Sequence, residues 1–153
     1  MSPQSAAHCR SPAILFSDHH PSSSNGGEEL VLREILLGLA ARGWRCLLAY
    51  HAWGDLVPEY EAAGIECRRF DLAPLRLGNP ARFLASIARQ ALWARRRQVR
   101  LLHCNSYVRA AHGAAVEGFA GLPAVCHLHN PLPEYLSRQY RWGLRHLDRL
   151  VAV

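Results

Sequence analysis

Short apolar runs alternate with longer helix-forming segments along this chain of 153 residues, and the alternation restricts the folds that the chain can adopt. The apolar runs predict strands at residues 12–17, 44–50, 65–70, 100–105, 124–129 and 150–153. The segments between them predict helices at residues 27–42, 56–63, 80–98, 107–120 and 133–146. Strands that alternate with helices form a parallel sheet with helices on both faces. We therefore expect an α/β fold: a doubly wound, mostly parallel, Rossmann-like sheet of about six strands.

Size and composition fit one soluble, globular domain. Half of the residues are hydrophobic and a fifth are charged, and no apolar run reaches the roughly 18 residues of a membrane span. Residues 1–11 are polar and lack the apolar core of a signal peptide, so we expect a flexible segment at 1–11, a domain at 12–153 and a cytoplasmic location. The five cysteines are an odd number without CxxC spacing, which indicates reduced thiols.

A glycine-containing turn joins the first predicted strand to the first predicted helix. Its glycines, Gly26 and Gly27, are followed by Glu28 and Glu29 at the predicted helix start. Glycines let the main chain approach a ligand closely, and a helix start offers unpaired N–H groups and a positive dipole end. The turn therefore predicts an anion site, although two glycines are also compatible with a tight turn that binds nothing.

Polar residues follow several predicted strands at their carboxyl ends, where ligands bind in such sheets. Under right-handed connections the first and fourth strands are neighbours and the fifth lies beside the fourth. We therefore expect the Gly26-Gly27 turn, Asn105-Ser106 and His129 to share one rim. His19 and His20 follow the first strand and are candidates for contact with a substrate, with a plain solvated loop as the alternative.

The formal charge of +6 comes from arginine, which is concentrated at Arg95-Arg96-Arg97 and Arg100. A solvated helix end would explain this cluster. The predicted helix at 80–98 also carries Phe83, Leu84, Ile87, Leu92 and Trp93, so contact with an anionic membrane is a second hypothesis, in competition with packing on the sheet. No nucleic-acid motif accompanies the cluster, and we expect no nucleic-acid partner.

An ordered set of short motifs runs through the chain from residue 26 to its end. The motifs are Gly26-Gly27-Glu28, Leu39-Ala40-Ala41-Arg42-Gly43-Trp44, Ala63-Gly64-Ile65, Leu101-Leu102-His103-Cys104-Asn105-Ser106, Gly121-Leu122-Pro123-Ala124-Val125, His127-Leu128-His129-Asn130 and Leu147-Asp148-Arg149-Leu150-Val151-Ala152-Val153. In this order and spacing they resemble the N-terminal domain of a family 4 glycosyltransferase with the GT-B architecture.

The resemblance implies one half of an enzyme with two Rossmann-like domains that face a cleft. Such enzymes transfer a sugar from a nucleotide-sugar donor to an acceptor with retention of configuration, and they usually need no metal or other cofactor. By position, Gly26 and Gly27 match the loop that faces the donor phosphates, and His129 matches the histidine that contacts the donor sugar. His19, His20, Asn105, Ser106 and Asn130 would lie on the acceptor side of the cleft.

The chain departs from the family pattern in two respects. Asn130 stands where an aspartate is common, so a charge is missing at that position. The C-terminal domain that holds the donor is absent from the 153 residues, and we expect the chain alone to be inactive. A possible membrane contact would place the complete enzyme at the inner face of the membrane.

Other functions remain open on sequence grounds. A non-catalytic module that binds nucleotides or anions is one, since half of the enzyme is missing. A metal-dependent enzyme could use His19, His20, His103, His127 or His129, but strand alternation would place His127 and His129 on opposite sides of the sheet and leave His127 structural. A dinucleotide-dependent dehydrogenase is weaker, because the turn lacks the G-x-G-x-x-G pattern.

Overall fold

The chain forms one parallel sheet, which the computed structural model describes for residues 12–72 and 79–152. The order is β3-β2-β1-β4-β5-β6, and all neighbouring strands run parallel. The strands are β1 Ala13–Ser17, β2 Arg45–Tyr50, β3 Glu66–Arg69, β4 Val99–Cys104, β5 Ala124–Leu128 and β6 Arg149–Ala152. This order is that of Rossmann-like folds, and it confirms the predicted fold class. The flexible segment predicted at 1–11 lies outside the described residues.

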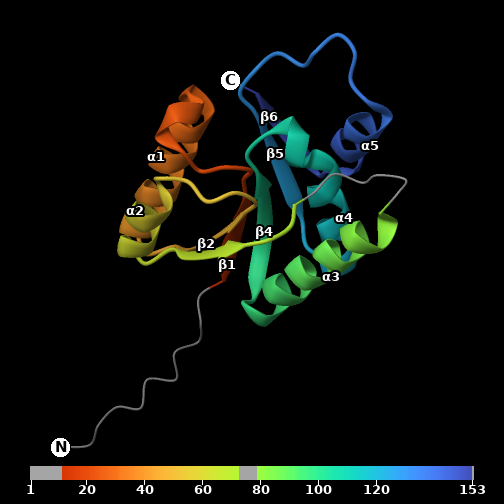
Figure 1. The fold of residues 1–153 in the computed structure, drawn as a ribbon. Helices are drawn as coiled ribbons and strands as arrows, with labels where there is room; N and C mark the ends of the chain where they lie inside the picture. Colours follow the sequence, from red (N-terminus) through yellow and green to blue (C-terminus); the bar gives the residue numbers. More distant parts are fainter. Residues whose placement is uncertain (1–11, 73–78, 153) are drawn as a thin grey trace, which may run out of the picture.

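Helices cover both faces of the sheet (Figure 1). Helices α1 (Gly27–Ala41) and α2 (Val57–Ala62) lie on one side, and α3 (Pro80–Arg96), α4 (Ala110–Ala120) and α5 (Arg138–His146) lie on the other. Short 3₁₀ turns, η1 (Ser23–Asn25) and η2 (Tyr107–Arg109), precede α1 and α4. Among the described residues, no helix combines the length and apolar character needed to cross a lipid bilayer.

Alternation along the strands produces a separate core on each face. Leu15, Leu47 and Leu102 belong to the core beneath α3 and α4, whereas Phe16 and Leu48 belong to the core beneath α1 and α2. Successive side chains of a strand point to opposite faces, so strands that are apolar throughout can supply both cores. Complete burial of such side chains is worth about 1.5–3 kcal/mol each, which ties both helical layers to the sheet.

Helix ends explain where the predicted boundaries were wrong. The helix predicted at 133–146 begins only at Arg138, because Ser137 caps it by accepting a hydrogen bond from the Tyr140 N–H over 3.3 Å. The helix predicted at 107–120 is also wrong at its start, where the 3₁₀ turn η2 precedes α4. The other predicted elements agree with the structure to within two residues at each described end.

Helix α3 directs most of its apolar residues inward. Phe83, Ile87 and Trp93 are buried, while Leu84 and Leu92 are exposed. The outer arginines bind the protein itself: Arg82 pairs with Asp71, Arg97 pairs with Glu66, and Arg95 donates to the Ala120 and Phe119 carbonyls. Packing therefore takes most of the apolar area that the membrane hypothesis assigned to this helix.

Candidate functional site

The carboxyl ends of β1, β4 and β5 meet at one rim. The Asn105 N–H, just beyond β4, donates to the Ser17 carbonyl at the end of β1 over 3.0 Å. Beyond β5, His129 Nε2 lies 3.0 Å from Asn105 Oδ1, and Asn105 Nδ2 lies 3.4 Å from Asp18 Oδ1. Asn105 thus joins the segments that follow all three strands.

A hollow of about 290 Å³ opens at this rim. It lies between the end of β1, the start of α1 and the 3₁₀ turn η2. The residues that line it are Asp18, His19, Asn25, Glu28, Glu29, Ser106, Val108 and Arg109. The switch in strand order falls between β1 and β4, so the hollow occupies the place where ligands bind in open α/β sheets.

The Gly26-Gly27 turn stands exposed at the edge of this hollow. Gly26 has φ +96°, a conformation that side chains rarely adopt, and a Cβ at Gly27 would meet no atom within 4 Å. Two hydrogen bonds anchor the turn: Asn25 Nδ2 donates to the His20 carbonyl over 2.6 Å, and the Ser23 N–H donates to Asp55 Oδ1 over 2.9 Å. The first N–H groups of α1, which a helix leaves without an intrahelical partner, therefore follow an anchored and exposed loop.

The residues predicted on the acceptor side do not all reach the hollow. His19 and Ser106 line it, and the exposed His19 ring stacks on His51 with centroids 5.1 Å apart. Asn130 does not line the hollow, but its Nδ2 lies 3.4 Å from Oε2 of Glu28, which does. His20 does not line the hollow and instead supports the turn through its contacts with Asn25.

Sequence reasoning did not predict that three charged residues at the rim are buried: Asp18, Glu29 and Arg109 are 1%, 3% and 5% exposed. Arg109 donates from its guanidinium to the Leu72 carbonyl over 2.8 Å, and its Nε has no partner in the described part of the chain. Burial lowers the pKa of Arg109, and burial together with Asp18 raises the pKa of Glu29 well above its usual range. For Arg109 the sequence offered one signal of burial, which is that this arginine begins a segment rich in small residues, 109–116.

The rings of His103, His127 and His129 contact one another in a row. The His127 and His129 rings lie 4.0 Å apart, and the His103 ring lies 5.8 Å from that of His127. The expectation that His127 and His129 face opposite sides of the sheet is therefore wrong, because residues two apart along a strand point to the same face. Burial lowers the pKa of all three histidines, and lowers that of His103 to about 4, which favours neutral rings.

Metal ligands do not converge at the rim. Within residues 12–72 and 79–152, no group of three or more His, Cys, Asp or Glu side chains has an arrangement that could hold a metal ion. The His103, His127 and His129 rings contact one another edge-on or tilted. Zinc requires three or four ligands directed at one point, which these ring contacts do not provide.

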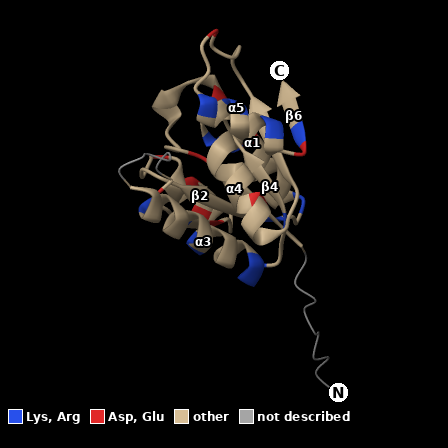
Figure 2. Ribbon diagram, turned by 90° about the vertical axis from the view of Figure 1, so that its right-hand side faces the viewer, with Lys and Arg blue, Asp and Glu red and all other residues tan. Residues whose placement is uncertain are grey.

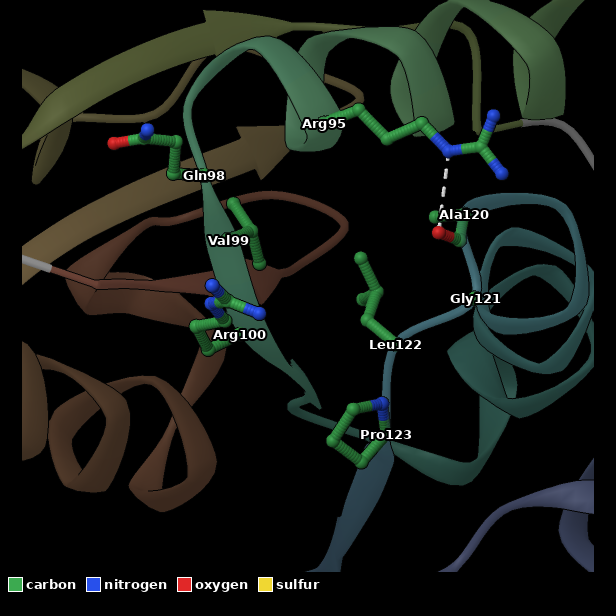
Figure 3. A pocket seen from close by; sticks show the side chains of 8 residues that line it. All are labelled: Arg95, Gln98, Val99, Arg100, Ala120, Gly121, Leu122 and Pro123. Atoms are coloured by element: carbon green, nitrogen blue, oxygen red, sulfur yellow. Dashed lines mark hydrogen bonds between the residues drawn. The ribbon is translucent and has the colours of Figure 1, made fainter.

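A second hollow, of about 320 Å³, opens at the opposite end of the sheet (Figure 3). Val99 begins β4 on one side of it and Pro123 precedes β5 on the other, while Arg95 reaches from α3 to the Ala120 carbonyl at the end of α4 over 3.2 Å. None of the site residues predicted from sequence lines this second hollow. The polar rim at the carboxyl ends is therefore the candidate site.

The family of the chain follows from a match over most of its length. The family model described as Glycosyltransferase Family 4 matches residues 25–153, from the glycine turn to the end of the sheet. The chain belongs to glycosyltransferase family 4. It corresponds to the N-terminal domain of such enzymes, and the family match supports a transferase role. No curated protein matches the chain.

Solved GT-B glycosyltransferases share the fold. HepE from Anabaena, in complex with UDP, is 26% identical with a TM-score of 0.67, over 90% of this chain and 36% of the HepE chain. MurG from Acinetobacter baumannii is 13% identical with a TM-score of 0.65, over 93% of this chain and 41% of the MurG chain. The chain therefore spans well under half of these structures. HepE has also been crystallised with UDP-glucose.

Proposed function

We propose that this chain is the N-terminal, acceptor-side domain of a two-domain enzyme. In this proposal the enzyme transfers a sugar from a nucleotide-sugar donor to an acceptor with retention of configuration, and it needs no metal. A second Rossmann-like domain holds most of the donor across a cleft. The family membership and the likeness to HepE, whose crystals contain UDP or UDP-glucose, support this proposal.

The observation that carries the proposal is the juxtaposition at one rim of the glycine turn and His129. Asn130, which follows His129, reaches Glu28 in the first turn of α1, and His129 itself is tied to Asn105. A donor that places its diphosphate near Gly26 and Gly27 can therefore have its sugar near His129. Main-chain N–H groups at the turn would stabilise the charge that grows on the leaving diphosphate.

His129 would act by orienting the sugar. A neutral imidazole can both donate and accept a hydrogen bond, and burial together with the neighbouring His127 lowers the pKa of His129. The acceptor would enter through the hollow lined by His19 and Ser106. Holding the two reactants in the attack geometry is the main contribution that these side chains can make.

Residues 1–153 by themselves should bind nucleotide sugars weakly, because they carry the phosphate-facing turn and span only 36% of the HepE chain. We expect dissociation constants of about 1 mM or weaker in calorimetric titrations with UDP-glucose, since few contacts remain. Addition of a donor-binding domain of a family 4 enzyme, by fusion or in trans, should restore sugar transfer. Tight, stoichiometric binding by the isolated chain would instead favour the alternative function, a self-sufficient nucleotide-binding module.

Peripheral membrane contact is better placed on α5 than on α3. Three arginines, Arg138, Arg141 and Arg145, lie on α5 without a described ion pair and, with Trp142, line a shallow hollow of about 340 Å³. Figure 2 shows basic residues along this helix. Trp142 is 45% exposed and Tyr135, in the preceding loop, is 88% exposed. Exposed aromatic rings beside unpaired cations fit the interface of an anionic bilayer.

Neutralising α5 should release the chain from anionic vesicles. We expect a triple change of Arg138, Arg141 and Arg145 to Gln to weaken binding to phosphatidylserine-containing vesicles roughly 100-fold at low salt, at about 1 kcal/mol for each arginine. Co-sedimentation across salt concentrations measures this effect. The matched control changes Arg42, Arg89 and Arg96 to Gln, which removes the same charge elsewhere. Equal losses in the two variants would contradict an α5 surface.

A further inference from the structure

We propose that Asp18 is a positioning residue for His129: acting through the Asn105 amide, it holds the His129 proton on Nε2 and leaves Nδ1 as a hydrogen-bond acceptor. The proposal rests on the role given above to His129 and adds the kind of chemical group that His129 can orient. It assigns a task to two buried residues, Asp18 and Asn105, that sit behind the exposed part of the rim.

Three side chains from three different strand ends form the chain of contacts. Asp18 follows β1, Asn105 follows β4 and His129 follows β5. Asp18 and Asn105 are 1% and 0% exposed, so solvent does not compete for their polar atoms. Asn105 Nδ2 lies 3.4 Å from Asp18 Oδ1, and Asn105 Oδ1 lies 3.0 Å from His129 Nε2.

The chemistry of the groups fixes the direction of both hydrogen bonds. An ionised carboxylate has no proton to donate, so the Asn105 group that faces Asp18 must be the NH₂. The Asn105 carbonyl oxygen then faces His129 and can only accept, which requires a proton on Nε2. The Asn105 main-chain N–H donates to the Ser17 carbonyl over 3.0 Å, which holds the residue at the rim while its amide bridges the two neighbours.

Charged groups are buried together with Asp18 at the rim. Glu29 is buried beside it, and a proton on one of the two carboxyl groups relieves the repulsion between them. Burial and the Asp18 charge raise the pKa of Glu29 strongly, which places the proton on Glu29. Arg109, also buried at the rim, interacts favourably with a negative Asp18. The other titratable groups that interact with Asp18 are Glu28, His19, Tyr60 and His129.

The consequence concerns Nδ1, the second ring nitrogen of His129. Within the described part of the chain Nδ1 forms no hydrogen bond, and with the proton on Nε2 it carries a free lone pair. A ligand group that His129 orients must therefore donate a hydrogen bond to it. Among the parts of a nucleotide sugar, a sugar hydroxyl meets this requirement and a phosphate oxygen does not.

The tautomer can be read directly in the folded chain by NMR. In ¹⁵N-labelled protein at neutral pH, long-range ¹H–¹⁵N spectra should show His129 with its proton on Nε2 and none on Nδ1. The Nε2 proton should also exchange with water about tenfold or more slowly than that of His20, because it is hydrogen bonded whereas His20 contacts Asn25 through Nδ1 and its Nε2 has no hydrogen bond in the described part of the chain. A His129 that carries its proton on Nδ1 in the wild-type chain would overturn the proposal, and no variant is needed for that result.

Two substitutions separate positioning from mere packing. In Asp18→Asn the new amide can turn either way, so Asn105 can present its NH₂ to His129, and we expect an Nδ1-protonated form to appear. In Glu29→Gln the amide can donate to Asp18 as a protonated glutamate does, and we expect the His129 spectrum to stay unchanged. A folded Asp18→Asn chain with the wild-type tautomer would refute the role of Asp18. These spectra do not depend on catalysis, so they fail separately from the proposed transferase reaction.

Discussion

His129→Ala is expected to lower kcat by about a hundredfold or more in a completed two-domain enzyme, while changing the KM for the acceptor far less. The reason is position: His129 stands at the rim, fixed through Asn105, and a group that orients the reacting sugar contributes mainly in the transition state. Steady-state kinetics with a fused or added donor domain measure both constants. Thermal unfolding of the same protein shows whether the loss is one of function alone.

Two further variants make the kinetic result specific. Gly27→Val should mainly raise the KM for the donor, because a Cβ at Gly27 meets no protein atom and the added methyls project where the diphosphate would lie. His127→Ala should act chiefly on the melting temperature, since His127 is 7% exposed and packs between the His103 and His129 rings. Normal turnover in His129→Ala beside a well-folded, inactive His127→Ala would exchange the two roles.

The sheet was predictable because its signal is local. Apolar strands separated by helices at 27–42 and 80–98 leave few options, and the right-handed connection rule then places β1 beside β4. Helix starts were less predictable. Pro133 suggested a helix start that the chain does not use, because Ser137 caps the helix and α5 begins at Arg138.

The candidate site was predictable in outline and not in its buried part. Because the carboxyl ends of β1, β4 and β5 meet, Asn105 and His129 could be placed together from sequence. The burial of Glu29 could not, since an acidic residue in a first helical turn usually complements the dipole from outside, and Asp18 follows β1 in a segment that is also compatible with a solvated loop. The proximity of Asp18 and Glu29 depends on tertiary packing, which a linear pattern does not encode.

Gly113→Ala is expected to destabilise the chain by about 2–3 kcal/mol, although alanine normally favours a helix. Gly113 lies in α4 where the helix crosses β4, and a Cβ there would sit 2.2 Å from the Cys104 Sγ. Cys104 is completely buried, so its side chain has little room to yield. Thermal or urea unfolding should show the loss as a decrease of about 4–10 °C in the melting temperature.

The cause can be isolated by removing the atom that clashes. Cys104→Ala alone should cost about 1–2 kcal/mol through the cavity that it leaves, yet Gly113→Ala with Cys104→Ala should be more stable than the sum of the single effects, because the new methyl occupies the vacated space. Gly118→Ala is the matched control on the same helix: its Cβ meets nothing within 4 Å, so we expect it to gain up to about 1 kcal/mol. Additive losses in the double variant would show that the close approach of α4 to β4 is not what requires glycine at 113. Non-additive losses would show that the close approach of α4 to β4 requires glycine at 113. The same approach positions the buried Arg109, which precedes α4, at the rim.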